Sequence, residues 1–416
     1  MPREDNSFEP SILSQGSPSY RWVMLGMAWY LHFSNALVLF SIAPLIGLII
    51  QEFSISFFEA GLLLGSITFG TLFLSILAGS ISDKIGARRA IAIAGILSSS
   101  GALLRGISFG FLDLLIFSTM VSVGTAIAFV SLPKMTREWF PQRQRASTNG
   151  VWNSGFNIGA LFTFAASVPL TVGVLGNWRL VFIIYGVVSL IATLLWISLS
   201  RGNAGRADET GIVAPRNTAY RLRQVAKSKD VWLFFLIFVF FMGSHMAVLS
   251  WLPALLQSRG MVAQTAGIVT SVVWIGSMAS SLIIPRLSDR IGLRKPFMFF
   301  FIPSYGFSVY AITLLDGPIL FVAVANLGFS ASYLMVFAPT ISQELPEMDV
   351  GSYGTAMGSI IAGYGVGGAV FSLLVGLVRD TAGSMHIAMF VLIASTQLAL
   401  LALIPLRETG WRDSST

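Results

Sequence analysis

Long apolar runs recur along all 416 residues, and they constrain the fold more than any other feature of the chain. An α-helix crosses a hydrocarbon core of about 30 Å with about 20 apolar residues, and scanning for such runs gives about 12 segments. We therefore predict an all-α polytopic membrane protein of about 12 transmembrane helices. The helices are expected at 22–50, 57–80, 90–110, 113–134, 149–171, 178–199, 231–256, 264–286, 297–315, 318–341, 352–377 and 385–406.

Composition excludes several other classes of protein. Only 11% of the residues are charged, against roughly 25% in an ordinary soluble domain, which argues against a soluble enzyme. The chain has no Cys and three His, so disulfides and thiolate metal sites are excluded and we expect neither a metal nor a cofactor. No Walker-type phosphate loop occurs, which disfavours an ATP-driven pump.

The distribution of polar residues predicts the domain organisation. One long polar stretch, 200–230, separates two sets of six apolar segments, so we expect bundles at 21–199 and 231–406 with tails at 1–20 and 407–416. Lys and Arg gather in the tails, this linker and alternate loops, which predicts cytoplasmic termini in the plasma (inner) membrane. The first 20 residues lack a basic-then-apolar signal peptide, so the first helix should direct insertion. Arg105, near the outer end of the third segment, is expected to snorkel to the membrane surface.

The two halves repeat one another. The stretch from Ser82 to Arg89 recurs from Ser288 to Lys295, and Gly155 pairs with Gly363 at nearly the same spacing. Pro44 and Pro253 form a third pair at nearly the same offset. Two similar bundles related by a pseudo-twofold axis can rock about a site at mid-membrane, which is the geometry of alternating access.

The first of these repeated stretches resembles the signature loop of the major facilitator superfamily. The resemblance rests on Gly79, Asp83, Lys84, Gly86, Arg88 and Arg89. It implies two six-helix bundles and a loop that gates, with Asp83 and the basic residues holding the halves together in the outward-facing state. The second copy offers Asp289, Arg290, Gly292, Arg294 and Lys295, although Pro285 stands where the leading Gly would be.

The fifth apolar segment and the residues before it indicate which branches of the superfamily the chain resembles. The run Trp139-Phe140-Pro141, followed by Arg145 and the Gly- and Asn-rich stretch 149–160, resembles anion-transporting branches. The organic anion:cation symporters and the cyanate and nitroimidazole porters are the most similar. Nitrate is disfavoured because 72–78 holds no arginine. Drug:proton antiporters carry an Arg ahead of a Gly in the fourth helix, whereas Met120 precedes Gly124 here.

Polar residues inside the apolar segments are the candidate site, since such residues are expensive in lipid. All 19 Asp and Glu can be placed in tails, loops or helix ends, which leaves His32 and His245 as candidates for coupling and substrate charge. Histidine titrates near pH 6.5 and suits proton coupling, but each could equally be neutral and only bond a neighbouring helix. Substrate orientation is assigned to Asn35, Asn153, Asn157, Trp251, Tyr333 and Tyr364.

These features predict a secondary active transporter and no enzyme. We expect proton-coupled uptake of a small organic anion or similar solute by alternating access, by a monomer whose partners are the solute, protons and the bilayer, with no nucleic acid. The alternatives are proton-driven efflux of a drug-like or metabolite molecule and, less favoured because the tails are short, a solute sensor that does not transport.

Overall fold

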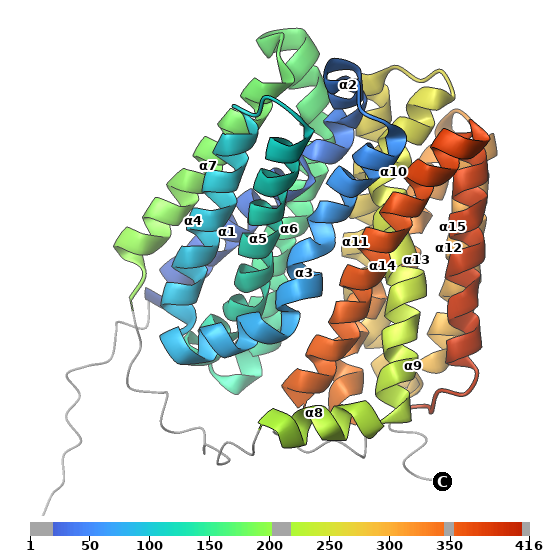
Figure 1. The fold of residues 1–416 in the computed structure, drawn as a ribbon. Helices are drawn as coiled ribbons and strands as arrows, with labels where there is room; N and C mark the ends of the chain where they lie inside the picture. The colour runs from blue at the N-terminus through green and yellow to red at the C-terminus, as the bar shows by residue number, and fades with distance from the viewer. Residues whose placement is uncertain (1–19, 202–217, 345–352, 410–416) are drawn as a thin grey trace, which may run out of the picture.

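The computed structural model describes residues 20–201, 218–344 and 353–409, and every regular element in these ranges is a helix (Figure 1). Eleven helical stretches in these ranges are long and apolar enough to cross a membrane, and the apolar stretch Phe57–Leu72 is shorter. The predicted fold class, an all-α polytopic membrane protein, is confirmed.

The first bundle, α1–α7, is joined to the second, α9–α15, through a linker that contains the short helix α8 (Figure 1). The first bundle contains α1 (Tyr20–Phe40), α2 (Ile42–Phe53), α3 (Phe57–Ile85), α4 (Ala87–Arg105), α5 (Phe111–Trp139), α6 (Gln142–Leu170), the π-helix η1 (Thr171–Leu175) and α7 (Trp178–Leu199). The linker and second bundle contain α8 (Thr218–Lys227), α9 (Lys229–Ile237), the π-helix η2 (Phe238–Gly243), α10 (Ser244–Ser258), α11 (Ala263–Ile291), α12 (Lys295–Leu314), α13 (Pro318–Glu344), α14 (Tyr353–Ala382) and α15 (Met385–Leu403). We call the end of the molecule where α8 lies the linker side, and the other end the opposite side.

The first apolar segment is interrupted rather than uniform. It forms α1 and α2, with a one-residue turn at Ser41 between them. Pro44 has no backbone N–H and so cannot complete the helical hydrogen bond to the residue four before it, which weakens the helix at this point. The seventh segment is also irregular, because η2 separates α9 from α10. Interrupted helices inside a membrane need other groups to satisfy their backbone.

Arg105 supplies such a group, and the expectation that it snorkels was wrong. Its side chain is fully buried. The guanidinium donates to the carbonyl of Val38 and, at 3.4 Å, to the hydroxyl of Ser41, both at the interruption between α1 and α2. It also donates to the Ser118 hydroxyl on α5 at 3.1 Å. The Val38 carbonyl, which also accepts from the Ser41 hydroxyl at 2.9 Å, therefore holds Arg105 inside the bundle rather than at its surface.

The two bundles contact each other along α3 with α14, along α6 with α11, and between α2 and α10, as Figure 1 shows for α3 and α14. Glycines allow the close approach: a Cβ on Gly61 would lie 2.6 Å from the Ser372 carbonyl, and one on Gly267 would lie 2.5 Å from that of Phe164. The Thr68 hydroxyl donates to the Gly365 carbonyl across the same interface at 3.3 Å. These contacts run from the opposite side to the middle of the helices.

Candidate substrate site between the two bundles

His32 lies in an aromatic cage inside the first bundle. Its side chain is fully buried, and its ring centroid lies 5.0 Å from that of Trp152, 4.8 Å from that of Phe156 and 6.2 Å from that of Phe129. The Trp152 indole is fixed by bonds to Thr136 and Asn149, at 3.2 and 3.0 Å. Neither ring nitrogen of His32 has a hydrogen-bond partner among the described residues. A buried polar group left without a partner costs about 1–3 kcal/mol, which makes this imidazole a candidate ligand-binding group.

The aromatic cage reaches the interface between the bundles through Phe156. Trp274 of α11 packs against Phe156 with ring centroids 6.2 Å apart and against Phe40 with centroids 5.1 Å apart. Trp274 is 8% exposed, and its indole N–H also finds no acceptor in the described part of the chain. A donor from the second bundle and an imidazole from the first thus share one aromatic neighbour at the middle of the molecule.

Three predicted asparagines lie on helices near this cage. Asn153 and Asn157 stand one turn apart on α6, on either side of Phe156 in the sequence; both are half-buried. Asn35 follows His32 by one turn on α1, is fully buried, and has no partner among the described residues for either amide atom. The structure therefore brings His32, Asn153 and Asn157 to the two helices that carry the cage.

The second predicted histidine has a different environment. His245 of α10 is hydrogen-bonded through Nδ1 to the Tyr305 hydroxyl of α12 at 3.2 Å, and the two rings meet edge to face with centroids 5.5 Å apart. Tyr305 also packs against Phe241 of η2 at 5.2 Å between centroids. The imidazole is thus partnered within the second bundle, which corresponds to the helix-bonding alternative left open for it.

The remaining predicted residues make their contacts away from the cage. Trp251 donates its indole N–H to the Ser372 carbonyl at 3.1 Å, and its ring lies 6.3 Å from that of Phe57 near the opposite side. Tyr364 donates to the Met246 sulfur at 3.2 Å. Tyr333 lies between Phe301 and Phe337, at 5.2 Å from each ring centroid, and its hydroxyl has no partner within the described ranges.

The two signature loops turn at glycines, as their sequence predicts. Gly86 and Gly292 have φ of +82° and +77°, values that favour glycine. Arg88 donates to the Ser200 hydroxyl at 3.0 Å, while Arg89 and Arg290 are exposed. In the second loop Arg294 pairs with Asp289 at 2.7 Å, and the Lys295 ammonium donates to the Leu406 carbonyl at 2.6 Å. The side chains of Asp83 and Lys84 and the surroundings of Gly79 lie outside what the structure describes.

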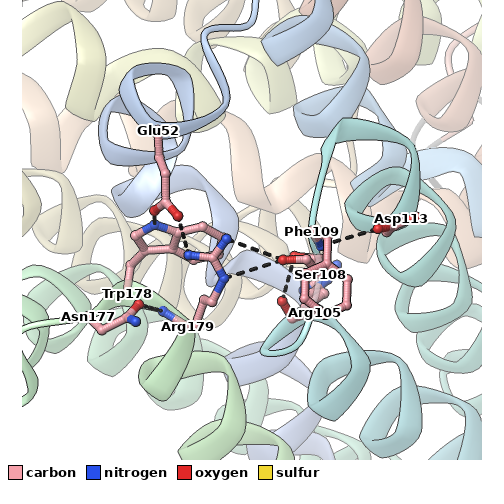
Figure 2. Close-up of polar contacts among 8 residues, drawn as sticks. All are labelled: Glu52, Arg105, Ser108, Phe109, Asp113, Asn177, Trp178 and Arg179. Carbon is pink, nitrogen blue, oxygen red and sulfur yellow. Dashed lines mark hydrogen bonds and ion pairs between the residues drawn. The ribbon is translucent and has the colours of Figure 1, made fainter.

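A polar network fixes the opposite side of the first bundle (Figure 2). Glu52, at the end of α2, accepts from the Trp178 indole and forms an ion pair with Arg179, both at the start of α7. Arg179 also donates to the Ser108 carbonyl at 3.3 and 3.2 Å, and the Ser108 hydroxyl donates to the Arg105 carbonyl at 2.8 Å. With the Arg105 side chain at its first end, α2 is held at both ends.

Sequence reasoning did not assign Trp274, Phe156 or Arg105 to a site. Phe156 stands in the α6 stretch that resembles anion transporters, but nothing in that pattern shows that its ring separates His32 from the second bundle. Trp274 is one of several tryptophans deep in apolar segments, so composition could not favour it over Trp251. Only the packing of α11 against α6 identifies it.

The fold and this central cage define a polytopic helical membrane protein built from two bundles that meet at a buried aromatic site. The model of the Major Facilitator Superfamily matches residues 28–372. The chain therefore belongs to this superfamily, as the signature loops predict.

Relatives and a solved structure agree with this assignment. A hexuronate transporter of Bacillus subtilis is 27% identical over 234 residues, which cover 54% of this chain and 54% of that protein. The cyanate transport protein CynX of Escherichia coli is 24% identical over 333 residues, 78% of this chain and 83% of that protein. The crystal structure of a D323A mutant of the nucleoside transporter NupG superposes with a TM-score of 0.73 at 14% identity, over 92% of this chain and 99% of that one. The chain thus spans about half of the hexuronate transporter and most of the other two proteins.

Proposed function

We propose that the chain is a secondary active transporter that takes up a small organic anion by proton symport, with His32 as the coupling group. The observation that carries the proposal is the His32 imidazole, which is fully buried among three aromatic rings and has no partner for either nitrogen in the described residues. Membership of the superfamily supports transport. The substrates in the names of two relatives, hexuronate and cyanate, support an anion.

The chemistry of the cage explains how proton and anion would move together. A protonated imidazole supplies the positive charge that an anion needs in a region of low dielectric, and the bound anion in turn stabilises the proton. Loss of either one leaves an unpaired charge, which is costly inside a membrane protein. The pair therefore binds and leaves as a neutral unit, which is the condition for symport.

The neighbouring groups would orient the solute. The Trp274 indole N–H of the second bundle has no acceptor among the described residues, and the half-buried Asn153 and Asn157 lie on α6. The rings of Phe156 and Phe40 offer apolar faces to the carbon skeleton of the solute. Because the cage draws on both bundles, rocking of one bundle against the other would open it to each side in turn.

The orientation in the membrane is part of the same proposal. The linker side carries most of the Lys and Arg, and this bias supports a cytoplasmic location for that side and for both termini, in a protein of the inner membrane. The two bundles of one chain form the whole cage, so we propose a monomer as the transporting unit.

Uptake into proteoliposomes tests the proposal. The panel is glucuronate, cyanate and small carboxylates, each with and without an inward proton gradient, with glucose as a neutral control. We expect gradient-driven accumulation of at least one anion, a loss of more than tenfold in His32→Gln, and retention in His245→Gln, because His245 already has a protein partner. Accumulation that is independent of the proton gradient, or that is retained in His32→Gln, would overturn the role of His32.

Efflux of an apolar or aromatic metabolite is the second candidate. The rings of Trp152, Phe156, Phe40 and Trp274 favour it, since they offer a largely apolar lining. The same vesicles distinguish the two functions: a failure of every anion to accumulate, together with gradient-driven movement of an aromatic dye against the proton flux, would replace uptake by efflux.

A further inference from the structure

The first turn of α3 is capped by a carboxylate from the other bundle. Asp380 of α14 accepts from the Phe57 N–H at 3.1 Å through Oδ1 and from the Phe58 N–H at 2.8 Å through Oδ2. These N–H groups open α3, which belongs to the first bundle, whereas Asp380 belongs to the second. The negative charge also lies at the positive end of the helix dipole.

The helix cannot satisfy these two groups itself. Its capping box uses Ser56 and Glu59: the Ser56 hydroxyl accepts from the Glu59 N–H at 3.2 Å, and the Glu59 carboxylate accepts from the Ser56 N–H at 2.8 Å. The N–H groups of Phe57 and Phe58 are left between them. An α-helix begins with N–H groups that need acceptors from outside the helix, and Asp380 provides the acceptors for these two across the interface.

Further contacts between α14 and the start of α3 surround this cap. The guanidinium carbon of Arg379 lies 4.9 Å from the centroid of the Phe57 ring. A Cβ on Gly376 would lie 2.1 Å from the Phe57 carbonyl, so glycine allows the two helices to meet there. The contact is therefore packed as well as hydrogen-bonded, and separating the bundles at this side would break it.

We propose that Asp380 is a latch that holds the opposite side closed by capping α3 across the two bundles. The inference rests on the alternating access of the proposed function. When the bundles separate at this side, the N–H groups of Phe57 and Phe58 lose their acceptors and the charge loses the helix dipole. Opening therefore exchanges two charge-assisted hydrogen bonds for bonds to water, and Asp380 biases the equilibrium between the two states.

The position of Asp380 in its helix has a counterpart in α3. Asp380 is the third residue from the end of α14, and Asp83 is the third from the end of α3. The two helices lie against each other, and each begins on the side where the other ends. The sequence resemblance gives Asp83 a latch role on the linker side. Asp380, at the same position from the end of its helix, would be the corresponding latch on the opposite side.

Distances between labels test the latch without any substrate. The chain has no Cys, so Val174→Cys and Val262→Cys, exposed at 75% and 65% near the opposite side of the two bundles, can carry a clean pair of spin labels. Leu199→Cys and Ile291→Cys form the matching pair on the linker side. In Asp380→Ala we expect the population with long distances at the opposite side to rise about threefold to tenfold relative to the short one, and distances at the linker side to shorten.

The controls separate the latch from general damage. Asp113→Ala removes a carboxylate that also accepts from a backbone N–H on this side, that of Phe109 at 3.2 Å, but within the first bundle. It should leave both distance distributions unchanged, and Asp380→Glu should restore part of the closed population. Unchanged distances in Asp380→Ala, or an equal shift in Asp113→Ala, would overturn the latch. Since no solute is present, either result is independent of the outcome of the uptake experiment.

Discussion

His32 and His245 occupy comparable places in the first membrane segment of each bundle, yet the structure surrounds them differently. His245 is bonded to Tyr305 of α12 at 3.2 Å, so its polar ring holds two helices of one bundle together. His32 packs against three aromatic rings and has no hydrogen-bond partner among the described residues. This difference in hydrogen bonding is the reason why we propose a binding role for His32 and not for His245.

Helix α12 accounts for much of this difference between the bundles. Besides Tyr305, it presents Ser304 and Ser308, which accept from the Asn326 amide of α13 at 3.0 and 2.7 Å. Polar side chains of the second bundle are therefore used to join α12 to its neighbours. In the first bundle, His32 and Asn35 have no hydrogen-bond partner among the described residues, and the comparison predicts that solute recognition depends more on the first bundle.

The largest effect is expected at Phe156, whose ring packs against both His32 and Trp274. Phe156→Leu removes the ring that both residues contact, so we expect uptake of the transported anion to fall by at least tenfold. Phe337→Leu, which removes a ring packed on Tyr333 in the second bundle, is the matched control and should change uptake by less than about threefold. Initial rates in proteoliposomes at equal protein density measure both. Equal losses of uptake in Phe156→Leu and Phe337→Leu would mean that solute recognition does not depend more on the first bundle.

A smaller effect is expected from the free indole donor. Trp274→Phe keeps an aromatic ring and removes the unpartnered N–H. The KM for the anion should rise about tenfold, because a hydrogen bond to a charged group contributes roughly 1.5 kcal/mol. Trp251→Phe serves as the comparison, because its N–H already bonds the Ser372 carbonyl. That variant should lower thermal stability and leave KM nearly unchanged. A KM unaffected by Trp274→Phe would remove the second bundle from solute binding.

The smallest effect concerns the partnered histidine. Tyr305→Phe deletes the hydroxyl that His245 bonds, and hydrogen bonds between membrane helices are worth about 0.6 kcal/mol on average. We expect a decrease in unfolding free energy of about that size and an unchanged KM. Tyr310→Phe, at an exposed position on the same helix, should change neither quantity. A large loss of proton-driven uptake in Tyr305→Phe alone would instead give His245 a part in coupling.

The sequence predicted the fold because apolar runs of membrane length and their duplication do not depend on tertiary detail. It also selected His32, Asn153 and Asn157, which lie on the helices of the cage. It could not show that His245 turns to Tyr305, because an apolar helix gives little indication of which face meets which neighbour.

Arg105 illustrates the same limit. A lone arginine near a helix end usually reaches the membrane surface, whereas the bonds of Arg105 to the Val38 carbonyl and the Ser41 hydroxyl, at the interruption between α1 and α2, accompany its burial. Asp380 was placed at a helix end from the sequence alone, and nothing there revealed that its neighbour is the start of α3.

The clamping of α2 at both ends has a mechanical consequence. With Arg105 at its start and Arg179 and Trp178 at its end, α2 turns only together with the rest of its bundle. Its 12 residues span about 18 Å, so a rigid rotation of about 15° about its inner end displaces its outer end by about 5 Å. A displacement of this size at the start of α3 exceeds the reach of any hydrogen bond. Under the proposed alternating access, a rotation of this size would break both bonds between Asp380 and the start of α3 in a single step.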